Sequence, residues 1–414
     1  MNKIKLGDVL EVKRGMSLPG EYYATEGDYI RLTLGNFNYP SCGWKKNVLK
    51  DNLFFTGNVR DEYILKKGDI ITPLTEQVRG LLGNTATIPE DALYIQSGDI
   101  GLIIPDETKL DKRFSYYLVS SSVVKKQLDA RSQQTKIRHT SPEAIKDCVA
   151  FIPIIKEQKK ISYLLDCINK KIENNNAIND NLQQQIRLLY NYWFTQFDFP
   201  DKNGNPYKSS GGTMVWSPII HRDIPVYWKV TKLLDIVSWE SNSQPPKSEF
   251  IYEPKDGYIR FIQNRDYDSD NHQTYIPYTK NLSTVDRFDI LMDKYGDAGA
   301  VRYGIEGAFN VALGKINVNR PNFQEYIRSF LESDGVYSYL HNSCMASTRA
   351  SLNESNLSML NVVIPDEDTL SAFQLQIRKI RESILLTNDE NLQLENLRNW
   401  LLPMLMNGQA VIQD

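Results

Sequence analysis

The clearest pattern of apolar and polar positions runs through residues 156–194, where apolar residues recur at alternating steps of four and three. This spacing is a heptad repeat, and it predicts one long helix without internal Pro or Gly. A helix of about 39 residues would be about 58 Å long. So narrow an apolar stripe does not stabilise an isolated helix in water, so the helix needs a partner. The expected seam positions are Ile161, Leu165, Ile168, Ile172, Asn175, Asn179, Leu182, Ile186, Leu189 and Trp193.

The partner helix lies in the same chain, because the same pattern returns at the constant offset that takes Ile161 to Phe373, here called the repeat offset. Arg398 interrupts the second seam, and Leu397 beside it is the candidate to take its place. The chain is therefore two copies of one unit, each ending in a long helix. The second seam is expected to contain Phe373, Ile377, Ile380, Ile384, Thr387, Asn391, Leu394, Leu401 and Leu405.

The centre of each seam is polar. Asn175 and Asn179 lie at the centre of the first seam, and Thr387 and Asn391 at the centre of the second. An antiparallel pair of helices would bring the two centres together. A polar group in such a seam fixes register at some cost in stability, and we expect these residues to do so.

Short runs with strand-like alternation fill the region before each long helix. In the first copy they include residues 29–32, 67–71 and 100–105, and residues 112–128 carry apolar residues at helical spacing. Residues 132–139 show no periodicity and predict a polar, basic loop. The strand-like runs recur near residues 233, 257 and 287. Turn-forming residues dominate 199–212, which predicts a linker between the copies.

Composition limits the classes of function. The 414 residues carry a net charge of −3, spread as +2 over 1–155, +1 over 156–198, −4 over 199–367 and −2 over 368–414. A contact with DNA would therefore depend on local basic clusters or on a basic partner. Four scattered cysteines and four scattered histidines favour reduced thiols in a cytoplasmic protein without a metal site. No apolar run reaches about 18 residues, so no membrane span is expected.

Signals of catalysis are weak along the whole chain. There is no phosphate-binding Gly-rich loop of the G-x-x-x-x-G-K-[ST] type, and Gly296–Gly299 reads as an ordinary turn near a strand. The Asn-Pro-Pro or Asp-Pro-Pro plus aromatic tetrapeptide of adenine methyltransferases is also absent. We therefore expect no catalytic residues and no enzyme activity in this chain.

The ends of the two long helices and the linker carry a family resemblance. The first helix ends in residues 190–200 (NYWFTQFDFP after Tyr190), the linker contains Lys208–Gly212 (KSSGG), and the second helix ends in residues 397–409 (LRNWLLPMLMNGQ). With a variable domain before each helix, this order resembles the DNA-specificity subunits of type I restriction-modification systems. The resemblance covers essentially the whole chain and is weak inside the two variable domains.

The resemblance implies an α+β chain with a pseudo-two-fold internal repeat. Two mixed α/β target-recognition domains would be separated by an antiparallel coiled coil of two long helices. The implied segments are an N-terminal target-recognition domain (1–153), the first spacer helix (154–198), a linker (199–215), a C-terminal target-recognition domain (216–365), and the second spacer helix with its tail (366–414).

The resemblance also implies partners. The chain would bind double-stranded DNA at a bipartite, asymmetric site, dock two methyltransferase (modification) subunits, and join a restriction/translocase subunit. The chemistry of the complex, N6-adenine methylation and DNA cleavage, would lie in those other chains. S-adenosylmethionine, ATP and Mg²⁺ would belong to the partner subunits, so no cofactor and no metal is expected in this chain.

Candidate DNA-contacting residues are loop residues whose side chains suit base edges or phosphates. Arg and Lys match guanine edges or phosphates, and Gln and Asn match adenine. Arg31 and Arg260 occupy matching strand positions, which favours a scaffold or phosphate role for both. The candidates are Gln77, Arg79, Gln133, Gln134, Lys136, Arg138, His139, Gln263, Asn264, Arg265, Lys294, Arg302, Thr348 and Arg349.

Two other readings stay open from the residues alone. The first is a coiled-coil adaptor that joins two proteins and never binds nucleic acid, which the acidic second half slightly favours. The second is a self-contained methyltransferase, which the missing motifs disfavour. A steep salt dependence of binding to duplex DNA would separate the DNA reader from the adaptor.

Overall fold

The structure is a computed structural model, and it describes residues 2–38, 42–48, 50–76, 80–131, 138–268, 270–345 and 351–412. It divides into two compact units. The first unit holds residues 1–174 and 390–414, and the second holds residues 175–389. Each unit therefore combines one block of short strands with one half of each long helix.

The first mixed domain, residues 2–152, is built from small sheets with three short helices. Its central strand, β10 (Ile100–Pro105), is the apolar run of the sequence and pairs antiparallel on both sides. The sheets, in strand order, are β1 (Asn2–Lys5) and β12 (Val149–Ile152); β2 (Leu10–Arg14), β10, β6 (Ile70–Pro73) and β8 (Ala86–Thr87); β3 (Tyr23–Ala24), β5 (Phe54–Phe55), β4 (Tyr29–Arg31) and β9 (Tyr94–Ile95); and β11 (Arg138–His139) with β7 (Thr75–Glu76). The helices are α1 (Lys112–Val119), α2 (Ser122–Arg131) and α3 (Pro142–Lys146).

The second mixed domain, residues 229–364, repeats much of this arrangement, but its described residues form no counterpart of the β7–β11 pair. Its sheets, in strand order, are β15 (Lys229–Lys232) and β24 (Asn361–Ile364); β16 (Val237–Ser241), β23 (Leu313–Val318), β20 (Ile290–Asp293) and β21 (Val301–Arg302); and β18 (Tyr275–Pro277), β17 (Tyr258–Ile262), β22 (Gly307–Phe309) and β19 (Thr284–Val285). The helices are α5 (Gln324–Leu331), α6 (Asp334–Met345) and α7 (Glu354–Leu357). Between the linker and this domain the chain forms the hairpin β13 (Met214–Ser217) and β14 (Arg222–Pro225).

The repeat extends to hydrogen bonds that frame each domain. The amide of Leu6 donates to the carbonyl of Cys148 at 2.9 Å, and that of Leu233 to the carbonyl of Leu360 at the same distance. In both domains one pair of strands is parallel, β4 with β9 and β17 with β22. The framework is therefore common to both copies, as the sequence repeat predicted.

One predicted helix is wrong in its length. Residues 112–128 were expected to form a single helix, but α1 ends at Val119 and α2 begins at Ser122. The break falls at Ser120 and Ser121, whose hydroxyl groups bond to nearby backbone. Serine side chains compete with the helical backbone in this way and favour helix ends.

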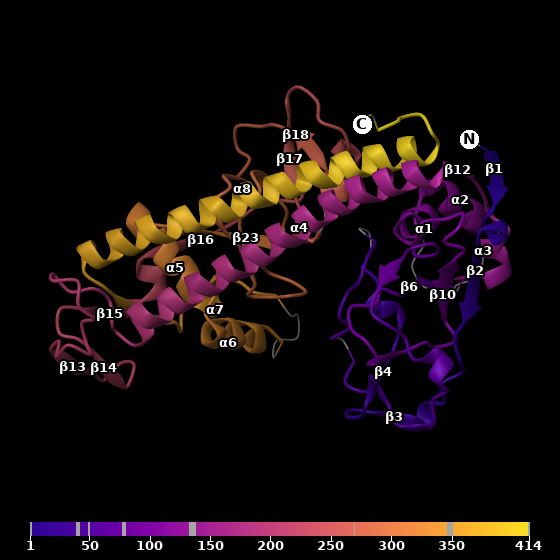
Figure 1. Cartoon of the computed structure of the whole chain (residues 1–414). Helices are drawn as coiled ribbons and strands as arrows, with labels where there is room; N and C mark the ends of the chain where they lie inside the picture. Colours follow the sequence, from indigo (N-terminus) through magenta and orange to yellow (C-terminus); the bar gives the residue numbers. More distant parts are fainter. Residues whose placement is uncertain are drawn as a thin grey trace. The chain divides into compact units, whose positions relative to one another are not determined.

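The two long helices are α4 (Ile155–Tyr190) and α8 (Glu367–Met406), and one turn of π-helix (Asn191–Thr195) extends α4. In the first unit, the early part of α4 lies alongside the late part of α8 (Figure 1). Lys160 bonds to the carbonyl of Ile412, Asn169 to Arg398 at 3.0 Å, and Lys171 to Glu390 at 3.0 Å. Residue numbers rise along one segment as they fall along the other, so the two segments are antiparallel.

The second unit has its largest core where α4 and α8 meet the second mixed domain. The aromatic end of α4 contributes Trp193 and Phe194, and the ring of Phe194 lies 4.5 Å from that of Tyr326 and 4.7 Å from that of Phe373. Aromatic rings at such separations bury large apolar areas with favourable edge-to-face contacts. The aromatic run at the end of the first long helix therefore anchors it to α5 and α8.

The predicted seam residues all lie on the inward sides of the two helices, buried or half-buried. The expectation that Leu397 takes the seam position of Arg398 is wrong. Leu397 is 43% exposed, whereas Arg398 is half-buried and donates to Asn169. A long Arg side chain can lie along an apolar seam while its guanidinium reaches a polar partner, which sequence spacing does not reveal.

At the polar centre of the seam, Asn179 bonds to Asn388, the neighbour of the expected Thr387. Asn179 is buried, and its Nδ2 donates to Oδ1 of the exposed Asn388 at 2.7 Å. Thr387 instead donates to the carbonyl of Ser383 on its own helix at 2.8 Å. The Oδ1 atom of Asn179 is buried and has no hydrogen-bond partner among the described residues.

We expect Asn179→Leu to raise the midpoint of thermal unfolding by roughly 2–4 °C, because it removes a buried polar atom without a partner and adds apolar contact worth about 1 kcal/mol. The matched variant Asn388→Ala should lower the midpoint, since it leaves the buried amide of Asn179 without its acceptor. Differential scanning calorimetry of both variants checks this. Two unchanged midpoints would show that the polar centre has no energetic role.

Candidate nucleic-acid interface

A small two-stranded sheet in the first mixed domain joins two segments that are distant in sequence. β7 and β11 pair antiparallel, with Glu76 opposite Arg138 and Thr75 opposite His139. Residues 77–79 directly follow β7, and residues 132–137 directly precede β11. The sheet therefore brings together the points at which two segments join the framework. The sequence places five candidate DNA contacts in these two segments.

The buried carboxylate of Glu76 holds together the chain segments around β7 and β11. Its side chain is 1% exposed, and its Oε2 accepts hydrogen bonds from the amides of Gly80, Leu81 and Leu82 at 2.8–3.0 Å. Its Oε1 lies 3.0 Å from the guanidinium of Arg138. A buried carboxylate needs several such partners, and here they fix the return of the chain after residue 79.

Arg138 is held on two sides. Its guanidinium lies 2.7 Å from a carboxylate oxygen of Asp129 and also donates to the backbone carbonyl of Asp129 at 2.9 Å. Only 14% of its side chain is exposed. These contacts assign Arg138 to the support of the loop, while the neighbouring His139 is exposed. Both residues lie in a strand rather than in the predicted loop.

Seven predicted DNA contacts lie outside the described residues. In the first mixed domain these residues follow β7 or precede β11, and in the second they fall between α6 and Leu352. Their roles stay predictions. The seven are Gln77, Arg79, Gln133, Gln134, Lys136, Thr348 and Arg349.

The flanks of the two corresponding segments match between the domains. The amide of Thr140 donates to the carbonyl of Leu74 at 2.8 Å, and the amide of Leu352 donates to the carbonyl of Lys294 at 2.9 Å. Thr140 and Leu352 are separated by the repeat offset, which also relates the two long helices. Residues 132–137 and 346–350 therefore return to the framework at equivalent places, and Lys294 lies at that place in the second domain.

The other candidates of the second mixed domain surround Thr274. Gln263 donates to the hydroxyl of Thr274 at 3.0 Å, and the exposed Arg265 approaches the same oxygen at 3.4 Å. Asn264 begins the short helical turn between them, after β17, and is half-buried. Of these three residues only Arg265 is exposed, and its guanidinium suits a contact with phosphate or a base edge.

Arg302 has a supporting role that the sequence did not suggest. Its guanidinium donates to Oδ2 of the buried Asp293 at 2.8 Å and lies 3.6 Å from Asp297. Burial raises the pKa of Asp293, and the hydrogen bond from Arg302 opposes that rise. Oδ1 of Asp293 has no partner among the described residues, so Arg302 supplies the main compensation for this carboxylate.

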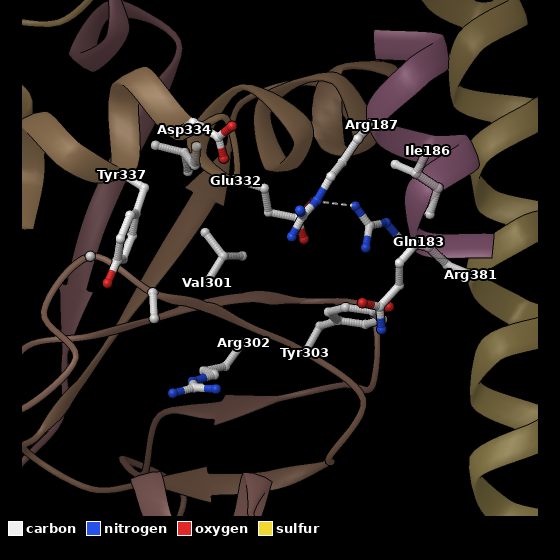
Figure 2. A pocket seen from close by; sticks show the side chains of 13 residues that line it. Gln183, Ile186, Arg187, Val301, Arg302, Tyr303, Glu332, Asp334, Tyr337 and Arg381 are labelled. Atoms are coloured by element: carbon white, nitrogen blue, oxygen red, sulfur yellow. Dashed lines mark hydrogen bonds and ion pairs between the residues drawn. The ribbon is translucent and has the colours of Figure 1, made fainter. Parts of the chain in front are cut away.

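Arg302 also lines a cleft of about 510 Å³ in the second unit, shown in Figure 2. In Figure 2, Gln183 of α4 lies beside Tyr303, and Tyr337 lies on the opposite side of the cleft. Glu332 and Asp334 give the cleft acidic groups as well, so its charge does not favour a phosphate. The cleft marks the junction between α4, α8 and the second mixed domain.

The matching arginines Arg31 and Arg260 serve the scaffold. Arg31 is buried, donates to the carbonyl of Asn52 at 3.1 Å, and lies 3.7 Å above the ring of Tyr23. Arg260 donates to Asp270 at 2.5 Å. Both guanidinium groups are engaged within their own domains, so of the two roles expected from sequence the contacts support the scaffold.

Sequence reasoning missed the buried acids at these points. Glu76 stands immediately before Gln77, and Asp293 immediately before Lys294, yet neither was a candidate. The available signal was an acidic residue at the end of an apolar strand, since a buried carboxylate there must find donors from the following turn. No cluster of three metal-ligating residues and no helix able to span a membrane occurs within the described ranges.

Comparison with known proteins gives the family. Residues 1–184 and 225–396 each match the family model described as "Type I restriction modification DNA specificity domain". The chain belongs to this DNA-specificity family. The two matches cover one mixed domain each, together with a large part of the long helix that follows it.

Comparisons with individual proteins agree with the family model. The chain is 23% identical to the type I restriction enzyme MjaIX specificity subunit of Methanocaldococcus jannaschii, over 75% of this chain and 72% of that protein. It is 21% identical to the HindI specificity subunit of Haemophilus influenzae, over 83% and 87%. The crystal structure of the S subunit from M. genitalium has the same fold, with a TM-score of 0.58, 14% identity, and coverage of 98% and 96%.

Membership of the DNA-specificity family changes the reading of the weaker candidates. The family model describes a DNA-specificity domain, and binding residues lie disproportionately on loops that a rigid framework positions, so residues at the framework ends of such loops are the first candidates. In this chain, the framework ends of those loops are the β7–β11 pair in the first domain and the hydrogen bond between Lys294 and Leu352 in the second.

Proposed function

We propose that this chain reads a bipartite, asymmetric DNA site, with one half-site for each mixed domain. The observation that carries the proposal is the double match to the DNA-specificity family, one match per domain. The frameworks of the two domains agree, while the segments that leave them differ in length and residue type. Two unlike readers on one chain suit two unlike half-sites.

The long helices would act as the spacer between the two readers. An antiparallel coiled coil related by a pseudo-two-fold axis would set two domains on one groove about one helical turn of DNA apart, roughly 34 Å. The antiparallel contacts of Asn169 with Arg398 and of Asn179 with Asn388 support this arrangement. Both helices would also carry the contacts with partner subunits.

The chain itself would be non-catalytic and would act in the cytoplasm. It would direct two methyltransferase subunits and a restriction/translocase subunit to the site, and S-adenosylmethionine, ATP and Mg²⁺ would be bound by those subunits. Membership of the DNA-specificity family disfavours the coiled-coil adaptor that never binds nucleic acid.

The test is a base-resolution map of N6-methyladenine in cells with and without this chain. The expected result is one asymmetric motif of two short half-sites and a fixed spacer, methylated only when the chain is present. Binding of the assembled methyltransferase to that duplex should weaken steeply with salt, because phosphate contacts release counterions. An unchanged map, or binding independent of salt, would leave the adaptor as the better reading.

A further inference from the structure

In the second unit a buried ionic cluster joins the second mixed domain to α8. Glu325 of α5 is fully buried and accepts from Nε of Arg381 at 2.7 Å and from Arg328 at 2.7 and 2.8 Å. Arg381 also donates to Glu332 at 2.7 Å, the contact drawn at the edge of the cleft in Figure 2. The carboxylate therefore belongs to the domain, and the opposing cation belongs to the long helix.

In the first unit the corresponding junction has the opposite polarity. Arg113 of α1 donates to Asp166 of α4, with Nε at 3.0 Å from Oδ2. The hydroxyl of Tyr117 donates to Asp166 at 2.6 Å and accepts from Asn169 at 2.9 Å. Here the cation belongs to the domain and the carboxylate belongs to the long helix.

The two junctions occupy equivalent positions. The repeat offset takes both ends of α1 to the two ends of α5, and it takes the start of α4 to the start of α8. At this offset Glu325 corresponds to Arg113. On the long helices, Arg378 corresponds to Asp166 and Arg381 to Asn169.

We propose that this reversed polarity makes each mixed domain specific for its own long helix. On the wrong helix, Arg113 would face Arg378 and Arg381, and Glu325 would face Asp166. Like charges brought together at a partly buried contact cost several kcal/mol, which is the repulsive element that specificity needs. The correct arrangement instead pairs Arg113 with Asp166 and Glu325 with Arg381, while Arg378 pairs with Glu382 of its own helix.

The apolar contacts at the two junctions are similar in kind. Ile161 and Leu165 of α4 correspond to Phe373 and Ile377 of α8, and all four are buried against their own domain. Volume-conserving apolar exchanges cost little, whereas opposed charges at a partly buried contact cost much more. The reversed ion pair is therefore a charged difference between the two docking sites, beside the buried Gln158 of α4, whose counterpart in α8 is Leu370.

This inference rests on the proposed function in one respect, since a fixed domain order keeps the two half-sites in a fixed order. Its physical content is independent of DNA.

The first test reverses one charge in the full chain. Asp166→Arg is expected to lower the unfolding midpoint of the first unit by roughly 5 °C, and Arg113→Glu added to it should restore most of the loss, because the pair then has the polarity of the second unit. Asp147→Arg is the matched control. Its partner Lys5 forms an ion pair with side chains 61% and 58% exposed, so a shift of at most about 1 °C is expected.

The second test asks for selectivity directly. A copy of residues 2–152 replaces residues 229–364, so that Arg113 of the copy meets Arg378 and Arg381 of α8. Limited proteolysis should cut at the graft roughly tenfold faster than at the native domain, and Arg378→Asp with Arg381→Asn should restore protection. A graft that is protected with both arginines present, or that the two substitutions fail to protect, overturns the inference, as does failure of Arg113→Glu to rescue Asp166→Arg.

All of these readouts are made without DNA. Loss of the reversed ion pair's effect would leave the proposed function intact, because the methylation map would still show one asymmetric motif. Conversely, a chain that changes no methylation could still show selective docking. The two ideas can therefore fail separately.

Discussion

A chain that ends after residue 205 is expected to assemble as a dimer and to direct methylation to a palindromic site. It keeps the first mixed domain and all of α4, and it loses the segment of α8 that covers the early part of α4. In the first unit that segment supplies Leu405 and Met406 to the core. Trp193 and Phe194 of α4 correspond to these two residues by the repeat offset, so a second copy of α4 can cover the exposed seam.

The symmetry of such a dimer decides the outcome. Two identical readers across a two-fold axis read two identical half-sites, and such a site is a palindrome. We therefore expect the first half-site of the full chain to appear twice in inverted order, with methylation of the original asymmetric motif lost. Sedimentation gives the oligomeric state, and a methylation map of cells carrying the truncated chain gives the motif.

The matched control ends after Met406, where α8 itself ends. This shorter deletion removes the tail, including the carbonyl of Ile412 that Lys160 contacts, but it leaves the seam complete. It should retain the asymmetric motif. An asymmetric motif from the chain without the second mixed domain and α8 would contradict the model of two readers.

The long helices could be predicted from sequence because their stability depends on a periodic pattern. Ile161, Leu165 and Ile168 recur at steps that only a helix seam requires, and the same steps recur at the repeat offset in the second copy. Local periodicity does not specify which polar atoms meet across the seam. For that reason Asn388 was missed as the partner of Asn179, and Leu397 was wrongly offered in place of Arg398.

The candidate interface was predictable only in part, because its organising contacts join residues distant in sequence. The composition of residues 132–139 predicted a basic loop, but Arg138 and His139 form strand β11, and nothing in that stretch shows that Arg138 pairs with Glu76 and Asp129. The repeat carried more information than the loops themselves. Thr140 and Leu352 could be aligned by the offset, and their hydrogen bonds locate the variable segments on a shared framework.

The base of the first variable loop gives the other large expected effect. Glu76→Ala should destabilise the first unit by about 3 kcal/mol, because it leaves Arg138 short of a buried partner and three amides without their acceptor. For a unit of this size the unfolding midpoint should fall by roughly 6–12 °C. Glu62→Ala is the matched control, since its ion pair with Arg60 is exposed and should contribute less than about 1 kcal/mol.

Comparison with Lys136→Ala separates the structural role of Glu76 from the predicted DNA contact of Lys136. Glu76→Ala should lose both stability and methylation that depends on the first half-site, because both variable segments leave the β7–β11 pair. Lys136→Ala should weaken binding of the assembled complex to duplex DNA and reduce its salt dependence, while the unfolding midpoint stays unchanged. If Glu76→Ala left the first half-site preference intact, the DNA contacts of this domain would have to lie away from β7 and β11, and Lys294 would lose the structural analogy that supports it as a DNA contact in the second domain.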